Sequence, residues 1–454
     1  MKIIICGAGK VGLTIARQLL INTENDITVI DYDENRLNDA KNLDLKTIYG
    51  FSSSPEILDR AGAMYAEMII CVTLSDEINM LTAHIAGTMF NVELKIARIR
   101  STMYLSGKWS SHIYNKNVLG IDHIVFPELE VAKHVMNMLY NVGLESKIPF
   151  YRNNYNLISI AINNFFSNKS VKDVIHKMND SDIDDFSIKF IKRANTIHFV
   201  HNKTFTLEKG DEIFILCKNK DISDIVRCIH GNISSLKKVL ICGGGEIGFN
   251  IAKLLEEEYF DVKILEIDQE RCQFLSEKLP SSVVICGNMH DRDIIKECGQ
   301  IDAVISVSGR DEVNIFTTLI AQSLKIPECF TLIDEYSYPD VFYSLNLKNI
   351  INTRDITISK ILNCIGGKYF TAQKTICNGL YNICEFIVHK HSDIVGMEYS
   401  KFDAIKMHIL GIIRDENLQT TGFEKGGKFI EGDVVLVVLP YQHTHKLEQF
   451  LAFD

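Results

Sequence analysis

The residues Lys2-Ile3-Ile4-Ile5-Cys6-Gly7-Ala8-Gly9-Lys10-Val11-Gly12 decide how the chain begins to fold. An apolar, β-branched run predicts a buried parallel strand, and the glycines after it let the backbone turn sharply and approach a pyrophosphate. The helical run that follows would point its N-terminus at the phosphates. Asp31 ends the next apolar strand, about 20 residues further on, where a carboxylate can accept hydrogen bonds from ribose hydroxyls. This order of features favours a nucleotide site over a plain strand-turn-helix corner.

Strand-like and helix-like stretches alternate through the first 130 residues. After the opening unit, apolar strands are predicted at residues 45–49, 68–72 and 94–100, with helices between them. Regular alternation of this kind is typical of a doubly wound parallel sheet. We therefore predict an α/β domain that begins with the nucleotide-binding turn.

Polar residues follow the predicted strands at the ends where such a sheet binds its ligands. Ligands lie beyond the carboxyl ends of parallel strands, so Asp31, Thr73 and Arg98 should meet the glycine loop in one crevice. Arg98 can pair with a phosphate there, or it can form an ordinary interface ion pair. For Asp76 and Glu77 the favoured interpretation is structural, because acids in the first turn of a helix complement its dipole.

After residue 130 the sequence pattern changes, and from Lys238 the opening pattern of the chain is repeated. A helix over residues 128–139 leads into β-rich sequence that predicts a small α+β module. Lys238 to Gly248 repeats the opening strand and glycines, and Glu266 stands in the place of Asp31. Because the module recurs too, the sequence predicts a duplicated two-part unit. The expected domains are residues 1–130, 131–230, 236–360 and 361–454, that is, two doubly wound parallel sheets, each followed by a small α+β domain.

The two halves differ where a phosphate would be bound. The second half has Leu332 and Asp334 where the first half has Arg98 and Arg100, so it lacks the cation of the first crevice. We expect the first site to bind polyphosphate anions more tightly than the second site.

Composition restricts the kinds of partner. The formal net charge is −10 over 454 residues, which argues against non-specific nucleic-acid binding. No apolar run approaches the roughly 20 residues that span a bilayer, and the N-terminus does not have the pattern of a signal peptide, so we expect a cytoplasmic protein. The twelve cysteines are scattered without C-x-x-C pairs, and we interpret them as small buried residues rather than as redox or zinc sites.

No stretch has the pattern of a catalytic apparatus. The sequence contains no Walker-type lysine loop, no H-E-x-x-H and no G-x-S-x-G. Neither small module offers an acid–base pair for hydride transfer, and the histidines fall in helices or beside apolar runs, where a structural role is the commoner one. We therefore predict no catalytic residue and no metal site.

These motifs resemble the RCK (regulator of potassium conductance) family. The resemblance covers the whole chain and rests on the two glycine loops and on Asn25 to Asp31, Asp76 to Met80, Ile96 to Ser101 and Ile121 to Glu128. It implies two Rossmann-like N-domains, each followed by an RCK C-terminal domain, in a non-enzymatic cytoplasmic gating subunit. It also implies binding of NAD⁺ or NADH, with ATP and ADP as alternative ligands. The implied assembly is a homotetrameric ring, peripheral to the membrane, beneath a potassium translocator of the TrkH/TrkG type.

Carried over position by position, the resemblance and the two glycine fingerprints give one set of candidate nucleotide-binding residues. In the first half they are Gly7, Ala8, Gly9, Lys10, Val11, Gly12, Asp31, Thr73, Leu74 and Arg98. In the second half they are Gly243, Gly244, Gly245, Glu246, Ile247, Gly248 and Glu266. The chain departs from the family pattern at Asn288, where an acidic residue is common, and Phe51 follows Gly50. An NAD-dependent dehydrogenase and a nucleotide-sensing scaffold for another membrane channel stay open as alternatives.

Overall fold

The computed structural model describes residues 1–451 apart from 21–24, 41–42, 44, 106–117, 152–153, 164, 182, 184–185, 201–203, 232–235, 336–338, 348, 366–369, 378–379, 421–422 and 424–425. The chain forms two compact units, and each contains one part of either half. The first unit comprises Met1–Tyr140 and Leu236–Cys364. The second unit comprises Asn141–Ser235 and Ile365–Asp454.

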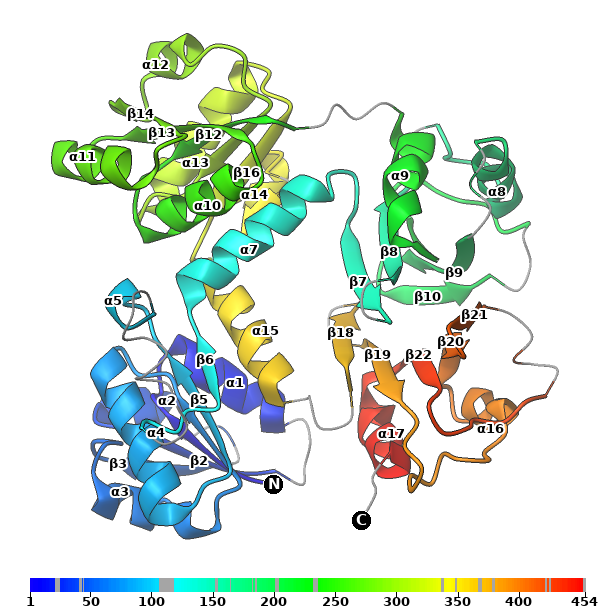
Figure 1. The fold of residues 1–454 in the computed structure, drawn as a ribbon, viewed down its shortest axis with the longest axis horizontal. Coiled ribbons are helices and arrows are strands. Elements are labelled where there is room, and N and C mark those ends of the chain that lie inside the picture. Colours follow the sequence, from blue (N-terminus) through cyan, green and yellow to red (C-terminus); the bar gives the residue numbers. More distant parts are fainter. Residues whose placement is uncertain are drawn as a thin grey trace. The chain divides into compact units, whose positions relative to one another are not determined.

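A six-stranded parallel sheet organises the first half of the first unit (Figure 1). Its strand order, β3-β2-β1-β4-β5-β6, places β1 at the centre, and the direction of the order reverses between β1 and β4. The strands are β1 (Lys2–Cys6), β2 (Asp26–Asp31), β3 (Lys46–Tyr49), β4 (Met68–Cys71), β5 (Leu94–Arg98) and β6 (His123–Val125). The helices are α1 (Lys10–Leu20), α2 (Glu34–Ala40), α3 (Pro55–Arg60), α4 (Asp76–Phe90), α5 (Thr102–Leu105) and α7 (Pro127–Tyr140).

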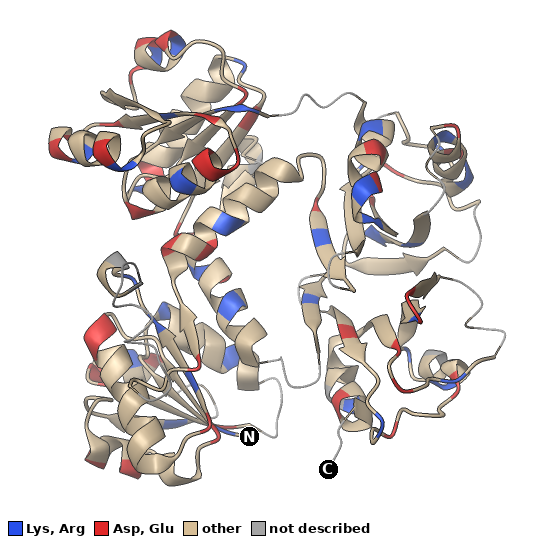
Figure 2. Cartoon of the chain, viewed as in Figure 1, with Lys and Arg blue, Asp and Glu red and all other residues tan. Residues whose placement is uncertain are grey.

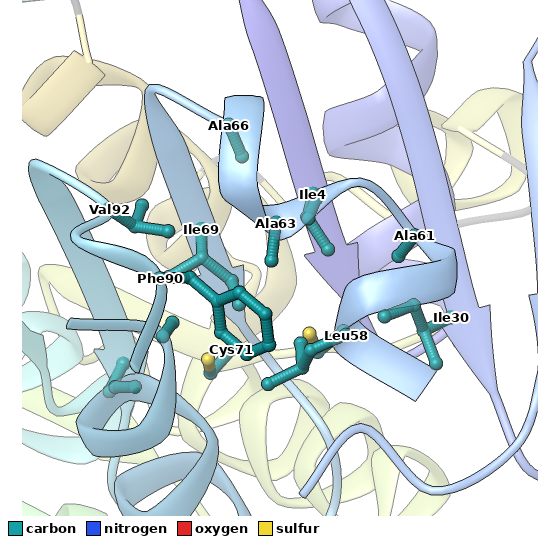
Figure 3. Close-up of a cluster of buried hydrophobic side chains, with 14 of the residues drawn as sticks. Ile4, Ile30, Leu58, Ala61, Ala63, Ala66, Ile69, Cys71, Phe90 and Val92 are labelled. Atoms are coloured by element: carbon teal, nitrogen blue, oxygen red, sulfur yellow. The ribbon is translucent and has the colours of Figure 1, made fainter. Parts of the chain in front are cut away.

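The apolar strand residues form a core against one layer of helices. Ile4 of β1 and Ile69 of β4 are fully buried, and Leu58 of α3 and Phe90 of α4 pack over them (Figure 3). Helix α4 begins sharply because the Ser75 hydroxyl accepts a hydrogen bond from the amide of Ile78. This core fixes the carboxyl ends of β1, β2, β4 and β5, from which the candidate site is built.

The second half repeats this sheet in the order β14-β13-β12-β15-β16-β17, again parallel. Its strands are β12 (Lys238–Cys242), β13 (Asp261–Glu266), β14 (Val283–Cys286), β15 (Ala303–Ser306), β16 (Glu328–Leu332) and β17 (Asn349–Ile351). Its helices are α10 (Glu246–Glu257), α11 (Gln269–Lys278), α12 (Arg292–Glu297), α13 (Asp311–Ser323), α14 (Pro339–Ser344) and α15 (Thr353–Ile365).

Helix α7 joins the two sheets of the first unit. It starts after β6 of the first sheet and packs against α10 of the second (Figure 1). The Tyr140 hydroxyl donates a hydrogen bond of 2.8 Å to Glu258, and Lys360 of α15 lies 3.5 Å from Glu130 of α7. The first compact unit therefore continues to Tyr140, past the boundary expected after residue 130.

The second unit contains two five-stranded antiparallel sheets, ordered β10-β9-β11-β8-β7 and β18-β19-β22-β20-β21. The elements of the first are β7 (Ser146–Phe150), β8 (Tyr155–Ala161), α8 (Val171–Asn179), β9 (Phe186–Arg193), β10 (Thr196–Phe199), β11 (Glu212–Lys218) and α9 (Ile222–His230). Those of the second are β18 (Ala372–Ile376), β19 (Tyr381–Ile387), α16 (Tyr399–Ala404), β20 (His408–Arg414), β21 (Asn417–Gln419), β22 (Val434–Pro440) and α17 (Thr444–Leu451). The two sheets share an apolar core that includes Phe150 and Leu436.

The predicted fold class is confirmed: two Rossmann-like parallel sheets alternate along the chain with two small antiparallel α+β modules. Lys, Arg, Asp and Glu residues are interspersed over both sheets of the first unit (Figure 2). Among the described residues, no helix combines the length and apolar character needed to cross a membrane.

Candidate nucleotide-binding site

The turn between β1 and α1 is tight because glycines allow close backbone contacts. Gly7 has φ +112°, and a Cβ atom on it would lie 3.1 Å from the backbone of Val72 and Thr73. A Cβ atom on Gly12 would lie only 1.9 Å from the carbonyl oxygen of Gly7, whereas one on Gly9 would meet nothing within 4 Å. Gly12 therefore brings α1 close to the strand, and Gly9 leaves open space in front of the helix N-terminus.

Asp31 is fixed beside this turn by backbone hydrogen bonds. One carboxylate oxygen accepts from the amide of Ala8 at 2.6 Å, and the other accepts from the amide of Asp33 at 2.9 Å. The side chain is 5% exposed. Each carboxylate oxygen has a further lone pair, so Asp31 can still accept hydrogen bonds from ribose hydroxyls.

Arg98 and Asn79 hold the loop after β4. The Asn79 amide donates to the carbonyl oxygens of Thr73 at 3.1 Å and Arg98 at 2.8 Å. The Arg98 guanidinium donates to the Thr73 carbonyl oxygen at 2.8 Å, and its Nε atom is buried without a hydrogen-bond partner among the described residues. Burial, and then the nearby Arg100, lower the pKa of Arg98 from its ordinary value.

Asp76 has a structural role beyond complementing a helix dipole. Its carboxylate accepts hydrogen bonds from the backbone amides of Arg100, at 3.0 Å, and Ser101, at 2.7 Å. Asp311 repeats this contact in the second half with the amides of Asp334 and Glu335. These acids tie the start of α4 or α13 to the loop after the neighbouring strand, so they position the crevice wall.

A cavity of about 470 Å³ opens at the carboxyl ends of these strands. This volume is in the range of small-molecule sites, roughly 300–1,000 Å³. The candidate residues that line the cavity are Gly7, Gly9, Lys10, Val11, Asp31, Thr73, Leu74 and Arg98. Ala8 and Gly12 do not line it: the Ala8 amide is directed to Asp31, and Gly12 faces the Gly7 carbonyl.

The cavity is also lined by first-half residues that are not among the predicted binding residues, although the sequence had drawn attention to Gly50 and Phe51. Tyr32 and Phe51 stack on each other, with ring centroids 5.4 Å apart and planes 11° from parallel, and both rings are about half exposed. The other first-half lining residues outside the predicted set are Ile30, Arg36, Gly50, Ser52, Val72, Ser75, Ile78, Arg100, Pro127 and Glu128. Tyr32 directly follows Asp31, and this position next to the predicted ribose-binding acid is the sequence signal that could have identified it.

One wall of the cavity comes from the second half of the chain, through Asp334, Thr353, Arg354 and Thr357. Among the buried side-chain atoms of the described residues that have no hydrogen-bond partner, four belong to lining residues: Arg98 Nε, Glu128 Oε2, Asp334 Oδ1 and Thr353 Oγ1. Buried polar atoms normally have partners. These unpartnered atoms, two from each half, make the cavity lining a polar surface suited to a polar ligand.

Glu128, at the start of α7, is an acid of the first-half lining of the cavity. Its carboxylate accepts a hydrogen bond of 3.2 Å from Arg100 Nε. Burial nevertheless raises the pKa of Glu128 above its ordinary value, because desolvation of the carboxylate outweighs the attraction of Arg100.

The second glycine loop repeats the geometry of the first. A Cβ atom on Gly248 would lie 1.9 Å from the Gly243 carbonyl oxygen, and Glu266 accepts a hydrogen bond of 2.6 Å from the amide of Gly244. The second half has no equivalent of Arg98, but Arg271 of α11 brings a cation to its glycine loop. The Arg271 guanidinium donates to the carbonyl oxygen of Gly244 at 2.7 Å. It also donates to Glu246 at 3.1 Å. Ile247, at the start of α10, completes this candidate set.

The cysteines do not all follow the expectation of small buried residues without a redox role. Cys272 of α11 and Cys286 of β14 form a disulfide next to the second loop, so that interpretation is wrong for this pair. Cys286 directly precedes Gly287 and Asn288, the position where the chain departs from the family pattern. Among the described residues, no three His, Cys, Asp or Glu side chains are grouped as metal ligands.

Comparison with known proteins gives consistent matches. The TrkA-N domain family matches this chain twice, over residues 3–127 and 239–353. A Trk system potassium uptake protein TrkA from Haemophilus influenzae is 30% identical over 404 residues, which cover 87% of this chain and 86% of that protein. Among solved structures, the GsuK RCK domain covers 99% of this chain and 94% of its own length, with a TM-score of 0.60 and 14% identity. The GsuK channel bound to NAD gives a TM-score of 0.60 at 13% identity, over 99% of this chain and 78% of that chain.

Proposed function

This chain belongs to the TrkA family, whose TrkA-N domain it carries twice, and we propose that it is a nucleotide-binding regulatory subunit that gates a Trk-type potassium uptake transporter. The observation that carries the proposal is the first-half cavity, where the glycine turn, the carboxylate of Asp31 and the cation Arg98 meet. No residue of this cavity is assigned a catalytic role. The subunit works by binding, and its ligand is NAD(H) or the pair ATP and ADP.

Each part of a nucleotide has a matching part of the cavity. The ribose hydroxyls donate to Asp31, and the phosphates lie in front of the N-terminus of α1, near Lys10. The exposed rings of Tyr32 and Phe51 offer a stacking surface to the base. Arg98 lines the same cavity, its Nε atom has no partner among the described residues, and we assign it to the phosphates. The similar GsuK channel binds NAD, which supports a dinucleotide ligand.

Nucleotide binding is linked to gating through the loop after β4. A ligand shifts a two-state assembly only by the difference between its affinities for the two states. A phosphate that draws the Arg98 guanidinium changes the bond from that guanidinium to the Thr73 carbonyl oxygen, and with it the start of α4. Moving an assembly from 10% to 90% open requires about an 80-fold difference in affinity, roughly 2.6 kcal/mol, which several sites can share.

The membrane partner completes the proposal. We place the chain in the cytoplasm as a homotetramer on the inner face of the membrane, held there by a translocator of the TrkH/TrkG type. The Haemophilus influenzae relative is a potassium uptake protein, which supports this class of partner.

Two measurements on the full chain test the proposal. Titration calorimetry with NAD⁺, NADH, ATP and ADP should give saturable binding, and the potassium flux of a TrkH/TrkG-type translocator, co-reconstituted with this chain in vesicles, should change with the bound nucleotide. Absence of nucleotide binding would contradict the proposal. Binding with a flux that ignores nucleotide would favour a scaffold for another membrane channel, and steady hydride transfer to a small substrate would favour a dehydrogenase.

A further inference from the structure

A disulfide in the second half joins Cys272, in the first turn of α11, to Cys286, the last residue of β14. Their Cα atoms lie 6.2 Å apart, inside the range of roughly 4.4–6.8 Å that disulfides span. Among the described cysteines Cys286 alone is exposed, and Cys272 is buried. The pair therefore combines one sulfur that a reagent in solution can reach with a second sulfur within bonding distance of it.

The first half has other residues in the places of both cysteines. Tyr49 pairs with Asp31 in the register in which Cys286 pairs with Glu266, so a tyrosine takes the place of the exposed cysteine. In the other position, six residues after the acid, the first half has Leu37. The disulfide is thus a feature of the second half that the repeat does not impose.

Helix α11 is also the element that covers the second glycine loop. Arg271, which directly precedes Cys272, donates to the carbonyl oxygen of Gly244 at 2.7 Å and to Glu246 at 3.1 Å. A Cβ atom on Gly244 would lie 2.4 Å from the Leu275 side chain, which comes from the next part of the same helix. The disulfide therefore holds α11 between the two residues through which that helix contacts the loop.

The same sulfur atoms lie against the acid that anchors the loop. The Cys272 sulfur is 3.5 Å from the carbonyl oxygen of Glu266, which also accepts a hydrogen bond of 2.8 Å from the amide of Gly287. The Glu266 carboxylate accepts from the Gly244 amide at 2.6 Å. As a thiol, Cys272 can donate to the Glu266 carbonyl oxygen, whereas in a disulfide it has no hydrogen to donate. A change in the bond between the cysteines therefore acts on the anchor as well as on the helix.

We propose that Cys272 and Cys286 form a reversible dithiol–disulfide modification site, and that oxidation of the pair locks α11 over the second glycine loop. The oxidant is a low-molecular-weight disulfide such as oxidised glutathione. The Cys286 thiolate attacks one of its sulfurs, which forms a mixed disulfide and releases one small thiol. The Cys272 thiolate then attacks the Cys286 sulfur, which forms the protein disulfide and releases the second thiol. The two electrons and two protons that the protein loses leave with these two thiols.

The surroundings suit exchange rather than a permanent cross-link. Cytoplasmic thiols are kept reduced, and disulfides formed there are usually transient or redox-sensing, so this step rests on the proposed cytoplasmic location. Cys272 lies in the first turn of a helix capped by Asp268, where the helix dipole favours the thiolate that attacks a mixed disulfide. The exposed Cys286 receives the small disulfide, and Cys272 resolves it.

Thiol chemistry on the full chain tests the modification site. The chain is equilibrated with mixtures of reduced and oxidised glutathione, alkylated and digested, and mass spectrometry follows the peptides that contain Cys272 and Cys286. We expect the disulfide to form with oxidised glutathione and to open with an excess of reduced glutathione. Cys228→Ser, which removes a half-buried free thiol of the second unit, is the matched control and should leave this behaviour unchanged. A pair that stays reduced in oxidised glutathione, or a disulfide that resists reduced glutathione, would overturn the proposal.

Amide hydrogen exchange, measured on the oxidised and the reduced full chain without nucleotide, tests the lock. Oxidation should slow exchange in residues 243–248 by about fivefold or more, whereas residues 7–12, the same loop without the cysteines, should change by less than about twofold. Cys286→Ser should abolish the difference between the two conditions. Arg271→Gln should reduce it, because α11 loses its bond to the Gly244 carbonyl oxygen.

Equal slowing of exchange in the two loops would mean that the disulfide only stabilises the chain as a whole, and would overturn the lock. An exchange rate in residues 243–248 that does not depend on the redox state would overturn it too. Neither result bears on the proposed nucleotide-dependent gating, because both measurements are made without nucleotide and without the membrane partner.

Discussion

Arg98 places a guanidinium where it is largely removed from water. Burial lowers the pKa of Arg98, and its hydrogen bond to the Thr73 carbonyl oxygen satisfies only part of its donor capacity. A protein gains no stability from an incompletely paired buried cation, since desolvation opposes its charged form. The nucleotide binding that we propose gives this cation of the cavity wall a partner.

Arg98→Gln separates binding from folding. We expect ATP affinity to fall by about tenfold or more, because a charge-assisted bond to phosphate is lost, while the free energy of unfolding changes by less than about 1 kcal/mol. Calorimetry and urea unfolding measure the two quantities. Arg17→Gln, an exposed cation near the end of α1, is the control. If Arg98→Gln unfolds the chain and leaves the affinity of the folded fraction intact, Arg98 is a structural residue.

Glu128 gives a pH-dependent prediction. Burial raises the pKa of Glu128 in the folded chain, so the group contributes stability below its unfolded pKa and loses that contribution as pH rises through the folded pKa. Glu128→Gln should therefore stabilise the chain at pH 7–8, by on the order of 1 kcal/mol, and the gain should shrink as the pH falls toward about 4.5. Unfolding free energies across this range, with the exposed Glu93→Gln as control, provide the measurement. A gain that is constant with pH would exclude ionisation of Glu128 as its cause.

At the scale of elements, the turn from β1 into α1 depends on two glycines with different tasks. Gly12 lets the helix approach the Gly7 carbonyl oxygen, and Gly9 keeps the space in front of the helix N-terminus open. The turn from β12 into α10 repeats the first arrangement with Gly248 and Gly243. Both halves therefore fix the first helix to the central strand by the same backbone contact.

A pair of glycine variants tests this contact. Gly12→Ala should lower the free energy of unfolding by about 3 kcal/mol, because a Cβ atom 1.9 Å from a backbone oxygen forces strand and helix apart. Gly9→Ala, which meets nothing within 4 Å, should stay within about 0.5 kcal/mol of the parent. Urea unfolding followed by circular dichroism compares the two. Similar losses in both variants would mean that helix approach is not what Gly12 provides.

At the scale of the whole molecule, the two halves share the glycine loop and its acidic anchor but differ in the residues around that loop. Asp31 and Glu266 make the same bond to their glycine loops. The first cavity has Arg98 and a wall from the second half, whereas the second loop is covered by Arg271, which bonds to the Gly244 carbonyl oxygen. The two glycine loops therefore have the same anchor but different surroundings.

Matched variants in the full chain test this asymmetry. Asp31→Ala should remove the tighter class of ATP binding, whereas Glu266→Ala should leave it in place, with the two dissociation constants separated by about tenfold or more. Both variants delete the same backbone anchor, so a difference between them reflects the surrounding site. Calorimetric titration with ATP resolves the two classes. Equal losses of tight binding in the two variants would contradict unequal sites.

Much of the fold followed from local pattern. The strands expected at residues 45–49, 68–72 and 94–100 appear as β3, β4 and β5, with small differences at their ends. They were predictable because apolar runs, turn residues and helix caps act within a few residues of each other. The end of the first compact unit at Tyr140 could not be read from local sequence. It depends on the packing of α7 against α10 of the other half, and residues near α7 in the sequence do not indicate that contact.

The sequence by itself determined the two glycine loops, their duplication and the meeting of Asp31, Thr73 and Arg98 at one sheet edge, because parallel strands bring their carboxyl ends together whatever the separation along the chain. Only the tertiary structure decided that Arg354 belongs to the site of the first half. The repeat in the sequence gives no signal for Arg354, because the equivalent residue of the first half is Glu128 and neither residue belongs to a motif that the two halves share. The long-range packing of α7 and α15 joins the halves, and long-range packing is set by the whole fold rather than by neighbours in sequence.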